Sequence, residues 1–301
     1  MRPSVILLSL SLFGFSLFAS TLFACAASGD RAAAAPAASQ AKLAAAAAAA
    51  EAKLAAAAAA AERSAAEAFA ARVSAASRTA ALPPALADTL LLAARSERAA
   101  LAAEIDSALS GDPFLVRLVD KKTALPADYA PADLVPLSGG SYIAGRAGML
   151  LREAAARSLE AMAAAAHADG ISLVVSSAYR SYAYQQTVRA RVEAELGEAA
   201  ADRESARAGQ SQHQLGLAVD FGSIDDSFAE TSAAAWLTAN ASRRGWSLSY
   251  PKGLETVTGY RWESWHYRYL GTAAAALAQK RFGGVQQYAL EFLDAWGRGS
   301  R

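Results

Sequence analysis

The chain has 301 residues, of which 54% are hydrophobic and 19% are charged, and its formal net charge is +1. This balance excludes a strongly basic nucleic-acid-binding protein and a protein with a highly acidic tail. The one cysteine, Cys25, excludes an intramolecular disulfide framework and a zinc ribbon built from cysteines. The three histidines, His167, His213 and His266, leave a short list of candidates for metal binding or acid–base chemistry.

Residues 1–25 have the layout of an export signal. Arg2 is followed by an apolar run that ends in small residues. The last four residues, Leu-Phe-Ala-Cys, resemble a bacterial lipobox, in which the cysteine is lipidated and becomes the new N-terminus. We therefore expect Cys25 to anchor the protein to a membrane through a lipid. Cleavage without lipidation and an uncleaved anchor helix are the alternatives, and all three place the remaining chain in the cell envelope, facing the periplasm or the cell exterior.

An alanine-rich segment follows at 26–111 and predicts a helical stalk or linker. Residues 41–51 read AKLAAAAAAAE, and residues 52–62 repeat them letter for letter. Alanine, leucine, lysine and glutamate favour helix, and an 11-residue period brings the leucines of the two repeats near one face. The segment is either a helical spacer or weakly self-associating coiled coil, or a frayed linker without a partner. A leucine-richer stretch at 85–109 either packs on the folded domain or continues the stalk.

From residue 112 onward aromatic, glycine, proline and β-branched residues become frequent, so we predict a folded domain at 112–301. Helices and short strands without regular βαβ alternation predict an α+β fold. In chain order, the predicted elements are a strand at 113–119, an irregular extended segment at 125–137, a helix at 146–168, a strand at 171–176, a helix at 181–196, a strand at 219–221, a helix at 232–245, strands at 246–250 and 265–269, and helices at 273–281 and 285–296.

The candidate metal ligands are His213, Asp220 and His266. A catalytic zinc ion uses three protein ligands and keeps one position open for water, and a single anionic ligand leaves the ion net positive. His213 and Asp220 are seven residues apart and would face opposite sides of a regular strand, so they can meet only if the chain turns near Gly216. The alternative is that both histidines are structural, one hydrogen-bonded in a loop and the other half-buried in a strand.

Two further side chains suit hydrolysis beside such an ion. Glu263 precedes His266 by three residues and can act as the general base for the water that zinc holds. Arg180 offers a fixed fork of donors for a substrate carboxylate or a developing oxyanion. His167 lies in an alanine-rich helix without an acidic residue or a histidine at ligand spacing, so we expect it to be a surface or helix-end residue.

These residues fall in motifs that resemble the VanY-type D-alanyl-D-alanine carboxypeptidases, a zinc peptidase group that also includes VanX-like dipeptidases and L,D-carboxypeptidases. The motifs are Ser-x-His-x-x-Gly-x-Ala-x-Asp at 211–220, Tyr-Arg-Ser at 179–181 and Glu-x-Trp-His-Tyr-Arg at 263–268. The resemblance covers residues 113–290 and does not extend to the stalk. It implies a small α+β fold in which an antiparallel sheet, flanked by helices, carries the zinc site.

The resemblance also implies a role for each matching residue. By this resemblance, His213, Asp220 and His266 are the ligands of one Zn²⁺ per chain, and Glu263 is the catalytic base. Arg180 anchors the polarised carbonyl or the substrate, and Ser211 supplies a hydroxyl that contacts the substrate. Gln186, which follows the Tyr-Arg-Ser motif, either lines the pocket and binds substrate or is a solvated helix residue.

We therefore predict an exported zinc carboxypeptidase that removes the terminal D-alanine from peptidoglycan stem peptides and has no nucleic-acid partner. An L,D-carboxypeptidase or a peptidoglycan endopeptidase would use the same site, because they differ in a pocket shape that the sequence does not show. The alternative from another class is a non-catalytic wall-binding module on a stalk. The presence of Glu263 together with all three ligands argues against that alternative.

Overall fold

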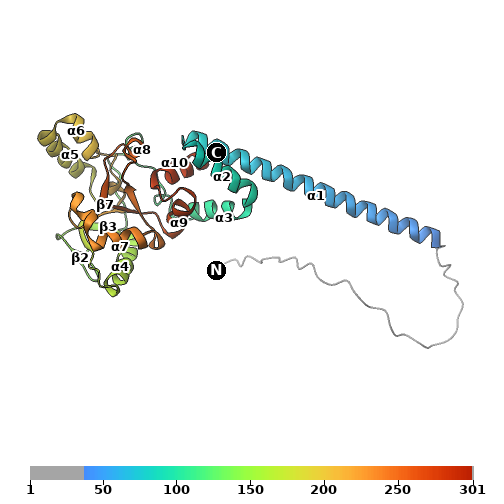
Figure 1. Cartoon of the computed structure of the whole chain (residues 1–301), viewed down its shortest axis with the longest axis horizontal. Helices are drawn as coiled ribbons and strands as arrows, with labels where there is room; N and C mark the ends of the chain where they lie inside the picture. The colour runs from blue at the N-terminus through green and yellow to red at the C-terminus, as the bar shows by residue number, and fades with distance from the viewer. Residues whose placement is uncertain (1–36, 300–301) are drawn as a thin grey trace, which may run out of the picture. The chain divides into compact units, whose positions relative to one another are not determined.

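The structure, a computed structural model, describes residues 37–299, so the predictions for the export signal and for Cys25 fall outside the described residues. The chain divides into two compact units, Met1–Ala57 and Ala58–Arg301. Figure 1 shows the order of the helices and strands along the chain. The candidate site lies in the second unit, and its geometry depends on how a small sheet is assembled there.

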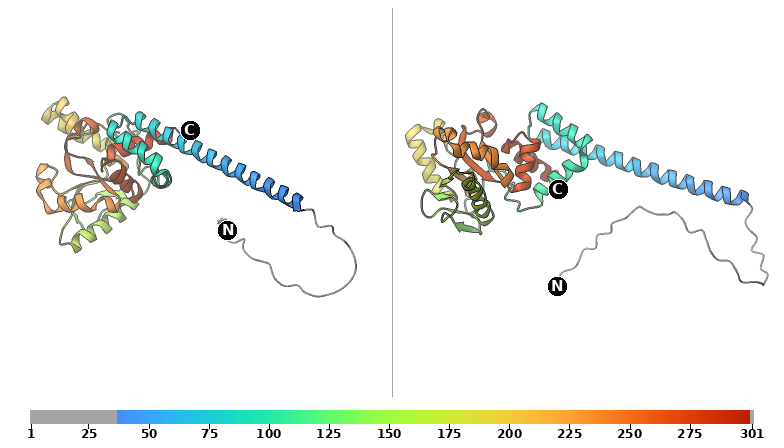
Figure 2. Two further views of the ribbon diagram at one scale, coloured as in Figure 1. Left: turned by 45° about the vertical axis from the view of Figure 1, so that its right-hand side comes forward. Right: turned by 60° about the horizontal axis from the view of Figure 1, so that its bottom comes forward.

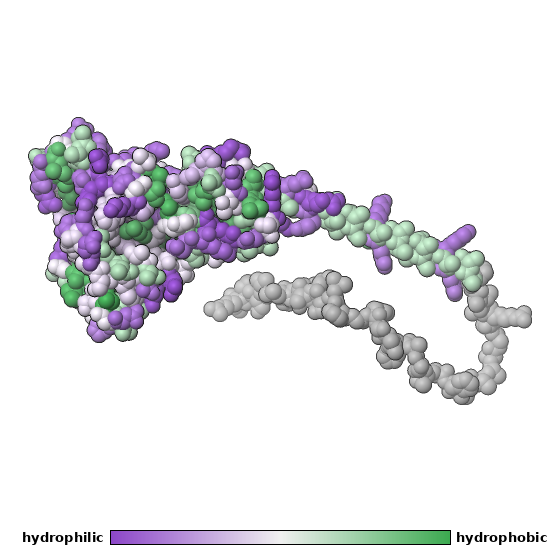
Figure 3. Space-filling model, in the orientation of Figure 1, coloured by the Kyte–Doolittle hydropathy of each residue, from purple (hydrophilic) through white to green (hydrophobic). Residues whose placement is uncertain are grey.

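Helix α1 (Ala37–Thr79) contains both alanine repeats, in agreement with the predicted helix. Every residue from 37 to 65 is exposed, and Figure 3 shows pale green alanine surface along this helix, interrupted by purple charged side chains. Alanine loses no side-chain entropy when it becomes helical, so an alanine-rich helix can form even where few of its side chains are buried. Among the described residues, this is the one helix that is long and apolar enough to cross a membrane by length and composition.

From Ala70 onward, α1 contributes to a hydrophobic cluster of the second unit. The stretch at 85–109 forms two helices whose buried leucines join the same cluster, so it packs on the folded domain and does not continue the stalk. The second compact unit therefore begins before residue 112, at Ala58. The leucines of the 85–109 stretch bury more apolar surface than alanines can, which stabilises their packing on the domain. The helices that meet the end of α1 in this cluster are α2 (Pro84–Ser96), α3 (Arg98–Leu109), α9 (Thr272–Arg281) and α10 (Gln286–Arg298).

Two leucines of α2 provide a test of this packing. Leu90 is 1% exposed, whereas Leu92 is 65% exposed. Leu90→Ala should lower the free energy of unfolding by about 2–5 kcal/mol, because it removes buried methyl groups and leaves a cavity. Leu92→Ala, the matched control, should change it by less than about 0.5 kcal/mol. Urea denaturation of the full chain measures both, and equally small losses would show that α2 is not part of the core.

The main sheet has five strands in the order β2-β4-β5-β7-β6. Strand β2 pairs with β4 in parallel, and every other neighbouring pair in this sheet is antiparallel, as the expected α+β fold requires. The strands are β2 (Ile143–Ala144), β4 (Val174–Ser177), β5 (Ala218–Phe221), β6 (Trp246–Tyr250) and β7 (Glu263–Tyr269). A separate antiparallel pair joins β1 (Leu134–Pro136) to β3 (Leu150–Arg152).

Helices α4 (Glu153–Ala168) and α7 (Ser232–Asn240) pack on this sheet, and their buried side chains share one hydrophobic cluster with the strands. Helix α4 begins later than predicted, because the three residues before it pair with β1. In Figures 1 and 2, α5 and α6 lie at the end of this unit away from α2 and α3. The remaining helical elements are α5 (Tyr182–Leu196), α6 (Glu198–Glu204), α8 (Glu255–Thr258) and the 3₁₀ helices η1 (Gln212–Leu215), η2 (Asp226–Glu230) and η3 (Ser242–Arg244).

The strand predicted at 113–119 is wrong, because residues 113–116 form turns and residues 117–119 belong to no helix or strand. The carbonyl oxygens of Phe114, Leu115 and Arg117 all accept hydrogen bonds from Nη2 of Arg268, at 3.3, 3.1 and 2.7 Å. The Arg268 side chain is fully buried. Since a buried guanidinium needs several acceptors and these carbonyls supply them, the same groups are not available to a strand ladder.

Candidate active site

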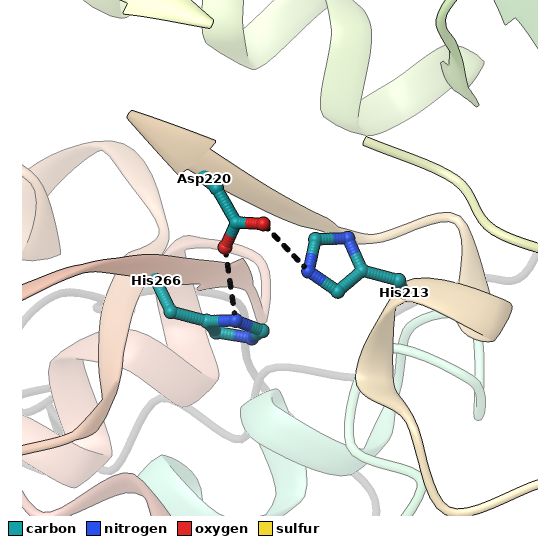
Figure 4. Close-up of side chains that lie close together, drawn as sticks. All are labelled: His213, Asp220 and His266. Carbon is teal, nitrogen blue, oxygen red and sulfur yellow. Dashed lines mark ion pairs between the residues drawn. The ribbon is translucent and has the colours of Figure 1, made fainter. Parts of the chain in front are cut away.

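The three candidate metal ligands come together inside the second unit, as Figure 4 shows. The Asp220 carboxylate lies between two rings: its Oδ2 is 3.2 Å from Nε2 of His213, and its Oδ1 is 3.1 Å from Nδ1 of His266. All three residues are buried, and one ligand atom from each lies within 4.8 Å of the others. The site therefore joins side chains from η1, β5 and β7.

The register between strands β5 and β7 explains how two of these residues meet. Asp220 lies directly opposite His266 in this antiparallel pair, so both side chains leave the sheet on one face. Glu263 precedes His266 by three residues and would face the other side of a regular strand. The pairing of β7 with β6 shifts between Leu248 and Tyr250, and Oε2 of Glu263 lies 3.4 Å from Nδ1 of His266. The irregularity thus brings the glutamate to the ligands.

His213 reaches the site through a tight turn. The 3₁₀ helix that carries it ends at Gly216, whose φ of 66° is left-handed. A Cβ atom at this position would lie 2.9 Å from Cγ of Arg152 and 2.9 Å from Cδ2 of Leu134, so a larger residue would clash as well as strain the backbone. The turn that the spacing between the first two ligands requires is therefore present.

The loop after β4 orients the His213 ring. Nδ1 of His213 lies 2.7 Å from the carbonyl oxygen of Ala178. A carbonyl can only accept, so Nδ1 donates, and the lone pair of Nε2 faces Asp220. In the same loop, the backbone N–H of Arg180 donates to the carbonyl of His213 at 3.2 Å. One loop therefore positions a candidate metal ligand and the candidate substrate-binding arginine.

The cluster opens into a cleft of about 430 Å³, which Arg180, Asp220, Glu263 and His266 help to line. The Nε atom of Arg180 is buried and has no hydrogen-bond partner among the described residues. The guanidinium can therefore bind an anionic group of a substrate. Helix α5 contributes a wall of the cleft with six side chains, Tyr184, Val188, Arg191, Val192, Glu195 and Leu196. A larger cavity of about 570 Å³, beside Tyr288, has no histidine in its lining.

Burial and neighbouring charges shift the pKa values of these groups. Burial, followed by the charge of Arg180, lowers the pKa of His213 to about 4, so its ring is neutral at pH 7. Burial alone would raise the pKa of Asp220, but the charge and hydrogen bonds that His213 and then His266 offer when protonated hold that pKa well below its usual value. Burial and the nearby Asp220 raise the pKa of Glu263 well above its usual value. A neutral imidazole and an ionised carboxylate are the forms that bind a metal cation.

These residues fit a divalent metal ion. Nε2 of His213 and Oδ1 of Asp220 are buried and have no hydrogen-bond partner among the described residues. Leaving buried polar atoms unpaired costs free energy, which a bound cation would recover. Two imidazole nitrogens and one carboxylate oxygen form a donor set that catalytic zinc sites use.

The other residues that the sequence singled out lie at the margin of this site or away from it. The Ser211 hydroxyl accepts from the backbone N–H of His213 at 3.3 Å and caps η1, and Ser211 is not among the residues lining the cleft. Gln186 is exposed and lies on a different face of α5 from the side chains that line the cleft, which agrees with a solvated helix residue. His167 is exposed, as expected.

One residue beside the ligands escaped the sequence analysis. Gln212 is 3% exposed, and its Oε1 lies 3.2 Å from Nε2 of His266. Its position inside the motif at 211–220 could have indicated a role near the site, because an amide between two buried positions needs polar partners. The identity of those partners depends on the tertiary structure.

Comparison with known proteins relates the chain to D-alanyl-D-alanine carboxypeptidases. Residues 148–272 match the family model for VanY, D-alanyl-D-alanine carboxypeptidase. The D-alanyl-D-alanine carboxypeptidase of Enterococcus faecalis (strain ATCC 700802 / V583) is 34% identical over 167 residues, 52% of this chain and 59% of that protein. The chain thus spans less than two thirds of the length of the curated relatives it matches.

Two solved structures are similar to the chain over most of their own length. The LdcB LD-carboxypeptidase is 34% identical, with a TM-score of 0.50, over 57% of this chain and 86% of that chain. The vancomycin-resistance D,D-pentapeptidase VanY from a VanB-type cassette, in complex with Zn(II), is 31% identical, with a TM-score of 0.50, over 59% of this chain and 99% of that chain.

The chain is an α+β domain in which two histidines and an aspartate cluster beside a cleft that a glutamate also lines. It has the class of peptidase fold that these two structures represent. Within that class, the chain belongs to the VanY-type family of D-alanyl-D-alanine carboxypeptidases.

Proposed function

We propose that this protein is a zinc-dependent carboxypeptidase that removes the terminal D-alanine from peptidoglycan stem peptides. The observation that carries the proposal is the buried His213–Asp220–His266 cluster, of which Asp220 and His266 line one cleft with Glu263 and Arg180. One Zn²⁺ per chain would be held by the three clustered side chains. Zinc bound there would polarise the scissile carbonyl and lower the pKa of water.

Arg180 is the group that we assign to the substrate. Arg180 is half-buried and lines the cleft, and a planar fork of N–H donors suits a carboxylate better than a point charge does. It would bind the C-terminal carboxylate of the peptide or the oxyanion that develops as water attacks. The backbone hydrogen bond to His213 keeps this arginine in a constant position relative to the ligands.

Glu263 is the group that we assign to proton transfer. Its carboxylate reaches to within 3.4 Å of Nδ1 of His266, so it lies beside the ligands without being needed to complete the set of three. It would take a proton from the attacking water and pass it to the nitrogen of the departing D-alanine. The C–N bond then breaks, and the shortened peptide leaves with a new carboxylate.

Three alternatives to a D,D-carboxypeptidase predict different products from the same peptides. The likeness to LdcB, 34% identical over 86% of that chain, favours L,D-carboxypeptidase activity as the second candidate. An endopeptidase that cuts cross-bridges would use the same ligands with a more open cleft. A non-catalytic wall-binding module would bind stem peptides without turnover. A base candidate and an arginine in the same cleft argue against the last of these.

The test is a product assay on defined peptides with the zinc-loaded full chain. A stem pentapeptide ending in D-Ala-D-Ala should lose one D-alanine, and elemental analysis should find one zinc per chain. Faster release from the tetrapeptide would support the L,D specificity, and cleavage of a cross-linked dimer would support an endopeptidase. Binding of the pentapeptide without any cleavage would overturn the enzymatic proposal.

The proposal includes export to the cell envelope, because the cell wall is where stem peptides are found. We propose that a lipid on Cys25, outside the described residues, anchors the chain to a membrane, and that the alanine repeats act as a spacer with weak self-association. The exposure of every residue from 37 to 65 supports a spacer. A labelled fatty acid should be incorporated into the wild-type chain and not into Cys25→Ser. Equal labelling would exclude this anchor.

A further inference from the structure

A chain of buried side chains connects the metal-ligand cluster to the C-terminal helix α10. It consists of Gln286 at the start of α10, Ser249 on β6, and Gln212 beside the first ligand. Their exposed fractions are 1%, 3% and 3%. Groups buried so deeply must satisfy one another, since water is not available to them. The direction of each hydrogen bond in the chain therefore carries information.

The direction is set at one end by a backbone carbonyl. Nε2 of Gln286 donates to the carbonyl of Ser247 at 3.2 Å, so Oε1 of Gln286 faces the other way and accepts from Nε2 of Gln212 at 3.1 Å. Oε1 of Gln212 then accepts from the Ser249 hydroxyl at 2.7 Å. Turning the Gln212 amide round would place two acceptor oxygens together. Turning both amides would place Oε1 of Gln286 against the carbonyl of Ser247.

The same oxygen of Gln212 lies 3.2 Å from Nε2 of His266. Since an amide oxygen can only accept, Nε2 of His266 must carry the hydrogen, and in the neutral ring Nδ1 then holds the lone pair. Nδ1 is the atom that lies 3.1 Å from Asp220, on the side of the ligand cluster. The two histidines thus use opposite ring nitrogens, because Ala178 holds Nδ1 of His213 in its protonated form.

We propose that Gln212 and Gln286 are positioning residues that hold His266 in the one neutral tautomer able to bind a metal through Nδ1. The inference rests on the metal site of the proposed function. It adds to that function a contribution from α10, which lies beyond residues 148–272 that match the family model. Partners that orient a ligating histidine affect metal affinity by about 10–100-fold when they are removed.

Helix α10 supplies its own matched control. Gln287 follows Gln286 and is also buried, at 6% exposure, but its amide bonds to Asp120 and Glu291 and does not reach the ligand cluster. Gln286→Leu and Gln287→Leu therefore remove the same amide from neighbouring positions on the same helix. Gln212→Met removes the acceptor that touches His266 while keeping a side chain of similar length.

The experiment measures two quantities that stability alone does not move. The first is the dissociation constant for zinc, from competition with a chelator; it should rise about 10–100-fold in Gln212→Met and Gln286→Leu and stay at the wild-type value in Gln287→Leu. The second is the ring ¹⁵N spectrum of the metal-free protein near pH 8, where an ordinary histidine is neutral. With three histidines in the chain, His167→Ala and His213→Ala assign the signals.

The wild-type protein should show His266 protonated at Nε2, and Gln212→Met should show a mixture of tautomers. His266 protonated at Nδ1 in the wild type would overturn the proposal even if a variant failed to fold. So would an unchanged zinc dissociation constant in Gln212→Met. If the wild-type chain bound no zinc, the proposed function would fail, while the ring spectrum would still test the hydrogen-bond chain.

Discussion

Glu263→Gln should lower kcat/KM for release of D-alanine from the stem pentapeptide by about 10²–10⁴, while the protein keeps its zinc. Glutamine has the size of glutamate but cannot accept a proton from water at neutral pH. The three ligand side chains are untouched, and they lie within 4.8 Å of one another without a contribution from Glu263. Kinetics on the defined pentapeptide and elemental analysis of the same preparation measure the two outcomes.

The control for this variant is Glu230→Gln, which removes one negative charge from an exposed position on η2. It should leave both kcat/KM and zinc content at wild-type values. Near-wild-type turnover in Glu263→Gln would exclude the glutamate as the base. Loss of zinc from Glu263→Gln would instead make it a fourth ligand, as its 3.4 Å approach to His266 geometrically permits.

His213→Ala should lose zinc, activity and the stabilisation that zinc provides. A ligand that binds only the folded state stabilises it by about 4 kcal/mol when present at a thousand times its dissociation constant. The midpoint of thermal unfolding of the wild-type protein should therefore fall when a chelator is added. In His213→Ala the midpoint should be the same with and without chelator, because the site lacks one of its three donors.

The third histidine is the matched control for this measurement. His167 lies exposed near the end of α4, away from the ligand cluster. His167→Ala should keep one zinc per chain and the full effect of the chelator on thermal unfolding. If His213→Ala retained one tightly bound zinc, the buried cluster would not be the metal site, and the assignment of the ligands would have to be abandoned.

Much of the local structure could be predicted from the sequence. The terminal helices and the strands near 246–250 and 265–269 begin and end close to the predicted residues. Their patterns are local, because apolar spacing and the residues at element ends act over a few positions. The turn at Gly216 was also predictable, since two ligands seven residues apart cannot meet in a straight strand.

The sequence was less informative where a distant partner decided the conformation. The segment at 113–119 has the apolar composition of a strand, yet the buried Arg268 draws its carbonyls into turns. The residues before α4 look helical but pair with β1 as a short strand. In both cases hydrogen bonds to residues far along the chain outweigh the local preference, because a buried polar group left unpaired costs more than a change of backbone conformation.

The sequence by itself determined which side chains are available for chemistry: the histidines, the carboxylates and the arginine stand in recognisable motifs, because chemical identity is a property of the residue alone. Only the tertiary structure decided how they meet. The register that sets Asp220 opposite His266, the strand irregularity that turns Glu263 toward them, and the bond between Gln212 and Gln286 all join separated segments. Such pairings depend on burying apolar side chains and satisfying buried polar groups throughout the domain at once, which no short stretch of sequence can specify.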